Sequence, residues 1–218
     1  PPTVLSVVTP LISAVFALAA QMLLRINLNS ALLTKKQNDI KTIALTFDDG
    51  PIPQATPFIL DTLAKYGVKA TFFVVGDNVR KFPDLFERII SEGHKVGNHT
   101  YHHISGYKHS ISTYINDVKK ADEYVHSHLF RPPYGWMKPE QRIWITQHYK
   151  IIMWDVITRD YSKRMRPDNV VNNVKRYTRN GSIITFHDSK RSIQNLHTAL
   201  PESIEWLMRE GYKFRTIE

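Results

Sequence analysis

Short strand-like runs alternate with amphipathic segments along most of the chain. Five short runs are predicted as strands, most of them buried. They span 42–47, 68–75, 94–98, 150–155 and 182–188. Six further segments, predicted as helices from the spacing of their apolar residues, span 58–65, 82–92, 111–128, 140–149, 167–178 and 198–210, and a last strand is expected at 212–217. The alternation predicts an α/β protein with a parallel sheet or barrel, with its functional groups at the carboxyl ends of the strands.

The boundaries of the first elements follow from residues that start or stop regular structure. Thr56 is expected to cap the helix at 58–65, with Pro57 at its first position. Gly67 is expected to end that helix, and Gly76 to stop the strand that follows. Residues 42–75 are therefore predicted to form a βαβ unit.

An apolar segment precedes these elements. Residues 4–24 carry no charge, and roughly twenty apolar residues are enough to span a bilayer as a helix. Two interpretations stay open: a membrane anchor, which the length of the segment favours, or a helix that packs on the barrel. The expected organisation is an apolar segment at 1–28, a polar linker at 29–40 and a catalytic domain at 41–218.

The composition of the chain restricts its protein class, the residues that could hold a metal and the partners it could bind. With 218 residues, 42% hydrophobic and 22% charged, the chain is an ordinary globular protein, expected to be a monomer. It contains no cysteine, so any metal must be held by His, Asp or Glu. The net charge of +9 suits an anionic partner. Because the basic residues are spread along the chain, we expect a solvated basic surface and no nucleic-acid partner.

Two adjacent carboxylates follow the first predicted strand. Asp48 and Asp49 stand before Gly50 and Pro51, which turn the chain. Neighbouring carboxylates make each other costlier to ionise unless a cation lies between them. The pair therefore suggests a metal site in which one Asp is a ligand and the other transfers protons. The alternative is a strand-ending pair that caps the next helix.

A histidine-rich segment follows the third predicted strand. His99 and His103 are four residues apart, so both imidazoles would project from one face of a helical turn. With one Asp they would give a carboxylate and two imidazoles, leaving positions for water and substrate. The alternative is a polar surface turn.

The segments 46–50 (TFDDG) and 99–103 (HTYHH) resemble the first two motifs of the polysaccharide deacetylases, carbohydrate esterase family 4. The resemblance runs from about Lys41 to Phe214. It implies an irregular (β/α) barrel with about seven parallel strands. It also implies one divalent metal ion, with zinc expected, and Asp48 as general base. The implied ligands are Asp49, His99 and His103.

The later motifs of that family also have counterparts. Segment 129–135 (LFRPPYG) resembles the third motif, which implies that Arg131 pairs with Asp48. The backbone N–H of Tyr134 would then form an oxyanion hole with the metal. Because proline stiffens the backbone, this loop would hold its amides in fixed positions, whereas the alternative is an ordinary proline-rich turn.

The fourth and fifth motifs are altered. The family often has an acid at the position of Ile157, tryptophan at that of Tyr161 and leucine at that of Thr185. Asp160 matches the acid that supports the catalytic histidine, and His187 matches the general acid. The aromatic residues expected to bind sugar are Tyr134, Tyr161 and Trp154.

The resemblance implies a metal-dependent hydrolase that removes N-acetyl groups from an N-acetylglucosamine-containing polysaccharide such as peptidoglycan or a chitooligosaccharide. Metal-activated water would lose its proton to Asp48, and His187 would protonate the leaving amine. The expected location is the cell envelope, with the protein membrane-anchored or exported. Two alternatives stay open: a catalytically silent carbohydrate- or metal-binding module, and an amide hydrolase of the same fold that acts on a small cyclic molecule.

Overall fold

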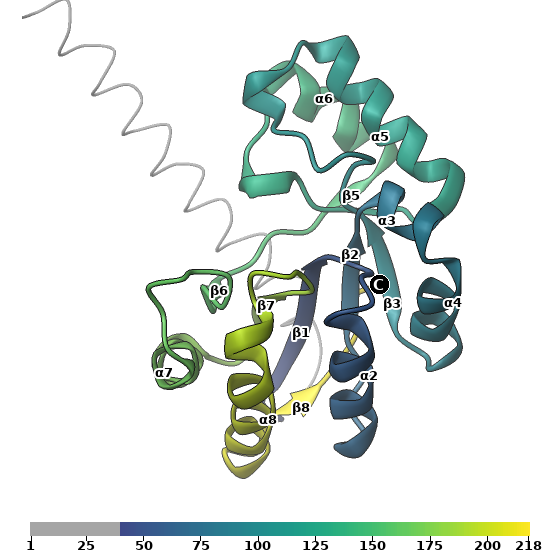
Figure 1. The fold of residues 1–218 in the computed structure, drawn as a ribbon. Helices are drawn as coiled ribbons and strands as arrows, with labels where there is room; N and C mark the ends of the chain where they lie inside the picture. Colours follow the sequence, from purple (N-terminus) through teal and green to yellow (C-terminus); the bar gives the residue numbers. More distant parts are fainter. Residues whose placement is uncertain (1–39) are drawn as a thin grey trace, which may run out of the picture.

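A parallel sheet forms the centre of the computed structural model, which describes residues 40–218 (Figure 1). The strands are β1 (Thr42–Asp49), β2 (Thr71–Val74), β3 (Lys95–Asn98), β4 (Leu129–Phe130), β5 (Lys150–Ile151), β6 (Val156–Ile157), β7 (Ser182–His187) and β8 (Lys213–Phe214). Seven of them follow the order β5-β4-β3-β2-β1-β7-β6, and β8 pairs with β1. Every pairing is parallel. The predicted α/β class and irregular barrel with about seven parallel strands are confirmed.

Helices cover the outside of the curled sheet (Figure 1). They are α2 (Thr56–Lys65), α3 (Gly76–Lys81), α4 (Pro83–Ser91), α5 (Ile111–Val125), α6 (Pro139–His148), α7 (Pro167–Tyr177) and α8 (Ile193–Arg209). Two short 3₁₀ turns span Gly106–Lys108 and Pro133–Gly135. The main apolar core lies between the outer face of the sheet and helices α2, α7 and α8.

Strand alternation sends neighbouring residues of β1 to opposite faces of the sheet. Leu45 and Phe47 belong to the outer core, whereas Ala44 belongs to a second, smaller cluster that includes Phe73 of β2. The same alternation directs Asp48 to the inner face, at the carboxyl end of the strand.

The barrel is irregular because its two end strands do not pair. Among the described residues, no ladder joins β5 to β6, although only residues 152–155 separate them in the chain. The Arg131 side chain donates hydrogen bonds to the carbonyl oxygens of Ile152 and Met153 at 3.0 and 3.2 Å. A side chain therefore satisfies main-chain acceptors where a neighbouring strand is missing.

Several predicted boundaries are wrong. The strand expected at 150–155 ends at Ile151, and a second short strand that was not predicted, β6, follows at Val156–Ile157. Between them the carbonyls of Ile152 and Met153 accept hydrogen bonds from Arg131. Helix α3 and strand β4 are missing from the sequence prediction, since six and two residues are too short to show a period. Helix α8 begins at Ile193 instead of 198 and continues through Pro201.

Thr56 does not cap α2. The cap position is Ala55, and Thr56 is the first helical residue. Its hydroxyl instead donates to Asp188 Oδ2 at 2.6 Å and accepts from the Ile52 amide at 2.7 Å. The threonine therefore joins the start of α2 to the end of β7.

The predicted anchor within 1–28 and nearly all of the predicted linker at 29–40 lie outside the described residues. Within residues 40–218, no helix combines the length and the hydropathy needed to cross a bilayer.

Candidate active site

A cleft of about 570 Å³ opens at the carboxyl ends of the strands. Eight of the ten predicted site residues line it. The lining residues are Asp48, Asp49, His99, His103, Tyr134, Trp154, Ile157, Tyr161, His187, Ser189, Lys190 and Arg191. The other two, Arg131 and Asp160, are buried and each bonds to a lining residue.

Three potential metal ligands converge at the cleft. Each of these residues offers one potential ligand atom, and the three atoms, from Asp49, His99 and His103, lie within 4.8 Å of one another. Asp49 Oδ1 is 3.7 Å from His99 Nε2 and 3.1 Å from His103 Nε2. Metal–ligand bonds of about 2.1 Å at tetrahedral angles would separate two ligand atoms by about 3.4 Å. The spacing fits a single ion held by one carboxylate and two imidazoles.

The protonation states also suit a cation. His99 Nδ1 is 2.7 Å from the carbonyl oxygen of Arg131, which can only accept, so Nδ1 carries the proton and Nε2 has a free lone pair. Burial lowers the pKa of His99 to about 4, which keeps the ring neutral. Burial opposes ionisation of Asp49, but the hydrogen bond from His103 and the charges of nearby histidines lower its pKa to about 2. A cation between these atoms would likewise favour the ionised carboxylate.

The histidine segment is not the helical turn that the i, i+4 spacing suggests. Residues 99–103 form an irregular loop in which Thr100 and His103 have φ angles of 63° and 55°. Asp49 and Tyr134, also at the cleft, have φ angles of 85° and 60°. Such left-handed conformations cost roughly 1–3 kcal/mol each outside glycine and are concentrated at functional sites.

Neighbouring elements hold this loop in place. Asp117 of α5 accepts hydrogen bonds through Oδ2 from the amides of Tyr101 and His102, at 2.9 and 3.0 Å. The Gly76 and Asp77 amides of α3 donate to the Thr100 and Tyr101 carbonyls, each at 3.0 Å. The sequence prediction missed both contributions, and both act on the residues between the two candidate histidine ligands.

Arg131 fixes the position of Asp48. It is the largest fully buried side chain among the described residues, and its Nη1 donates to Asp48 Oδ1 at 2.6 Å. The same nitrogen contacts the hydroxyls of Thr46 and Thr185 at 2.8 and 3.2 Å. Thr185, where the family usually has leucine, thus supplies an acceptor to the buried guanidinium. A guanidinium that is buried away from water is tolerated only when several hydrogen-bond acceptors surround it, as they do here.

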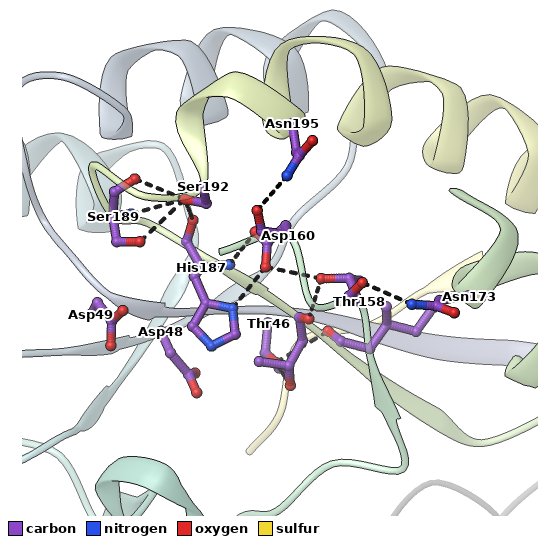
Figure 2. A network of polar contacts seen from close by, with 12 residues as sticks. Thr46, Asp48, Asp49, Thr158, Asp160, Asn173, His187, Ser189, Ser192 and Asn195 are labelled. Carbon is purple, nitrogen blue, oxygen red and sulfur yellow. Dashed lines mark hydrogen bonds and ion pairs between the residues drawn. The ribbon is translucent and has the colours of Figure 1, made fainter. Parts of the chain in front are cut away.

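Asp160 holds His187 in a matching arrangement (Figure 2). Asp160 Oδ1 is 2.8 Å from His187 Nδ1, and Oδ2 accepts from the His187 amide at 2.8 Å. Burial opposes the charged ring, but the charge and hydrogen bond of Asp160 prevail, with help from Asp49 and Asp48. The pKa of His187 rises to about 9. The ring is therefore an imidazolium at neutral pH, with Nε2 available as a proton donor.

The register of the sheet brings the two reactive groups together. Asp48 on β1 is the direct partner of His187 on β7, and both side chains line the cleft. Figure 2 shows the His187 ring reaching toward the Asp48 carboxyl group, with Asp49 close by. A proton acceptor, a proton donor and a three-ligand set therefore share one cavity.

Aromatic side chains form the walls. Tyr134 is 62% exposed and its ring centroid lies 4.8 Å from that of His103. The Tyr161 ring lies edge-on to His187, at 4.5 Å between centroids. Trp154 also lines the cleft, so all three predicted sugar-contacting residues lie there. At position 157 the family often has an acid, whereas Ile157 of this chain makes that part of the cleft apolar.

Asp188 follows the candidate acid but points away from the cleft. It is buried, it accepts from Thr56, and its amide donates to the Asp48 carbonyl at 2.7 Å. Burial raises its pKa to about 8. A Cβ on Gly50 would lie 1.9 Å from Asp188 Oδ2, so only glycine fits next to Asp49. Asp188 therefore joins the ends of β1 and β7 beneath the site.

Sequence reasoning missed three lining residues, Ser189, Lys190 and Arg191. They directly follow His187 and Asp188 and precede α8. Their place after a strand was the signal that could have identified them, since loops at the carboxyl ends of parallel strands form the active sites of such folds.

Comparison with known proteins identifies the family. Residues 35–149 match the family model described as polysaccharide deacetylase. The chain belongs to the polysaccharide deacetylase family. It is 39% identical over 183 residues to a peptidoglycan-N-acetylglucosamine deacetylase of Bacillus cereus, covering 80% of this chain and 66% of that protein.

Two further relatives, one named as a deacetylase and one as a pseudoenzyme, are also similar to the chain. The chain is 36% identical to the peptidoglycan-N-acetylmuramic acid deacetylase PdaC of Bacillus subtilis, covering 81% of this chain and 38% of PdaC. A solved PdaC structure superimposes with a TM-score of 0.75 at 33% identity, covering 84% of this chain and 90% of that one. A family pseudoenzyme of Bacillus anthracis has a TM-score of 0.72 at 29% identity, covering 83% and 65%. Because the fold also occurs in a pseudoenzyme, activity must be argued from the site.

Proposed function

We propose that this protein is a metal-dependent deacetylase that removes N-acetyl groups from an N-acetylglucosamine-containing glycan. The observation that carries the proposal is the meeting of three groups in one cleft: the Asp49, His99 and His103 ligand set, the Arg131-paired Asp48, and the Asp160-paired His187. The names of the relatives, which include peptidoglycan and chitooligosaccharide deacetylases, support the same reaction and substrate class.

The roles of the residues follow from their partners. Asp48, paired with Arg131, accepts the proton of the attacking water. The backbone N–H of Tyr134 donates to the oxyanion of the tetrahedral intermediate, an effect worth about 3 kcal/mol per donor. His187, an imidazolium beside Asp160, protonates the leaving amine, which is a poor leaving group otherwise. A bound divalent ion supplies Lewis acidity and lowers the pKa of water.

Zinc is the ion that we propose. Two imidazoles and one carboxylate, with further positions open, form a donor set that zinc favours in hydrolases. The same set also accepts other divalent first-row ions, so affinity alone does not select zinc. Metal analysis of the purified protein tests this part of the proposal separately from activity.

The alternative of a silent binding module is disfavoured by particular contacts. A module that only binds glycan needs neither a buried guanidinium on Asp48 nor a carboxylate on His187. Both pairs cost desolvation energy and polarise groups for proton transfer. The alternative of a small cyclic amide substrate is disfavoured because the cleft is open and has three aromatic wall residues.

Acetate release tests the proposal. The protein is incubated with N-acetylglucosamine oligomers and with peptidoglycan glycan strands, and acetate is measured. We expect release that a chelator abolishes and one equivalent of zinc restores. Acetate release from neither substrate by the metal-loaded protein would contradict the proposal.

We also propose that the protein works at the cell envelope and that residues 4–24 anchor it, with 41–218 as the catalytic domain. Removal of residues 1–30 tests the anchor. The shortened protein should stay folded and no longer partition into membranes. If it loses its fold instead, the segment packs on the barrel and the anchor proposal is wrong.

A further inference from the structure

The loop between β7 and α8 brings two cationic side chains to the cleft. Lys190 and Arg191 are exposed and line the same cavity as Asp49 and His187. The loop that carries them is fixed, because the Ser192 hydroxyl contacts the carbonyls of His187 and Ser189 (Figure 2). The loop that carries the two cations is therefore anchored to β7, the strand that ends in the candidate acid.

These cations differ from Asp48 and His187 in having no ion-pair partner among residues 40–218. Asp48 is matched by Arg131, and His187 by Asp160. By contrast, within residues 40–218 no hydrogen bond or ion pair joins Lys190 or Arg191 to another side chain, and the first turn of α8 carries no acid. The positive end of that helix adds to the same field. One wall of the cleft thus presents uncompensated positive charge.

A neutral oligomer of N-acetylglucosamine offers such a wall only hydroxyl and amide oxygens. A glycan of alternating N-acetylglucosamine and muramic acid differs, because every second sugar carries a lactyl arm with a carboxyl group. That carboxylate is free in peptide-free strands, whereas in peptide-bearing strands the stem peptide supplies the carboxylates. Arginine and lysine both bind carboxylates, and arginine can do so through two parallel hydrogen bonds.

We propose that Lys190 and Arg191 bind a carboxylate on the sugar next to the one that is deacetylated, so that the preferred substrate is an acidic amino-sugar glycan. This inference rests on the proposed function. The aromatic walls contact the sugar rings, and the cation pair selects the acidic neighbour. Since both side chains are exposed, salt screens the attraction, and the preference is strongest at low ionic strength.

The test combines matched substrates with matched variants. The substrates are an N-acetylglucosamine oligomer, a peptide-free peptidoglycan strand, the same strand with its lactyl carboxylates reduced to alcohols, and a peptide-bearing strand. The test variant is Lys190→Gln/Arg191→Gln. The control is Lys175→Gln/Arg176→Gln, which removes the same exposed residue pair and net charge from α7, away from the cleft.

We expect the test variant to lose roughly three- to tenfold in kcat/KM on a strand that carries carboxylates, whether peptide-free or peptide-bearing. This is the range for two exposed ion pairs. On the oligomer and on the reduced strand it should stay within about twofold of the wild type. The control should stay within about twofold on every substrate, and high salt should remove the difference.

A loss confined to the peptide-free strand assigns the contact to the lactyl carboxylate, and a loss confined to the peptide-bearing strand assigns it to the stem. An equal loss on charged and reduced strands would overturn the inference, and so would no loss on either. Both outcomes leave the deacetylase proposal standing, because that proposal fails only if the wild type releases no acetate.

Discussion

Arg131 places a permanent positive charge inside the barrel, 2.6 Å from Asp48. Its carbonyl oxygen also accepts the Nδ1 proton of His99, at 2.7 Å. One residue therefore orients the candidate base through its side chain and a candidate ligand through its backbone. This double role gives a function to a charged side chain that is completely buried directly after β4.

Replacing Asp48 by Asn separates proton transfer from metal binding. The variant keeps an acceptor for Arg131 but cannot take a proton, so we expect the rate of acetate release to fall by roughly two or more orders of magnitude. Metal content should stay at the wild-type level because Asp49, His99 and His103 are intact. Activity within tenfold of the wild type, with metal bound, would show that Asp48 is not the base.

Asp160 controls the protonation of His187, so Asp160→Asn should change the pH profile. The pKa of His187 is about 9 in the folded protein, so kcat should fall as the pH rises through 9. In Asp160→Asn this alkaline limb should move to lower pH by at least about one unit, since the main charge that stabilises the imidazolium is gone. A limb that does not move would assign the acid to another group.

The same ion pair makes stability depend on pH. The folded pKa of His187, about 9, is above its ordinary value of 6.5. Its contribution to stability is therefore complete below pH 6.5 and is lost as the pH rises through 9. In the metal-free protein, urea unfolding at pH 6 and pH 9.5 should show this difference in the wild type and a smaller one in Asp160→Asn.

Most residues of the site could be predicted from the sequence because they stand at strand ends in a recognisable order. Lys190 and Arg191 were missed, because in a chain of net charge +9 a basic pair looks like solvated surface, and only their place after a strand marked them. Asp117 could not be predicted, because an acid on an amphipathic helix gives no sign that it binds the backbone of another loop.

At the scale of elements, the loop at 99–103 shows how a strained segment is kept in place. It has left-handed residues at Thr100 and His103, and its backbone is bonded by α3 and α5. The i, i+4 spacing predicts that the imidazoles meet, which they do, but through a helical turn that does not form. Tertiary hydrogen bonds decide the local conformation here, and they are invisible in a local sequence pattern.

Asp117 is expected to position the ligands without touching the metal. Asp117→Ala removes the side-chain acceptor of the Tyr101 and His102 amides, so we expect zinc affinity to fall by about 10- to 100-fold. Competition with a chromophoric chelator measures the dissociation constant. Glu123→Ala, an exposed acid on the same helix, should leave it unchanged. Equal zinc affinities in the two variants would show that Asp117 does not position the ligands.

At the scale of the whole molecule, the parallel sheet explains why residues distant in the chain share a cleft. The central strands β1 and β7 carry Asp48, Asp49 and His187 to one edge, and β3 and β4 lead to His99 and Arg131 beside them. Alternation then separates His187, which faces the cleft, from Asp188, which bonds to Thr56, whereas both Asp48 and Asp49 reach the cleft.

The fold class could be predicted because strand and helix periods alternate over most of the chain. The interruption between β5 and β6 could not, because it depends on hydrogen bonds from Arg131, some twenty residues earlier. Short elements such as α3 and β4 lack enough residues to show a period, although both are needed to build the site.

Anomalous diffraction from crystals of the zinc-loaded protein locates the metal ion and so tests the proposed ligand set. We expect one zinc peak at the cleft, about 2.0–2.2 Å from a carboxylate oxygen of Asp49 and from Nε2 of His99 and His103. Asp48 should stay paired with Arg131, without contacting the ion. A zinc ion held by Asp48, or bound away from these three ligands, would contradict the proposed ligand set.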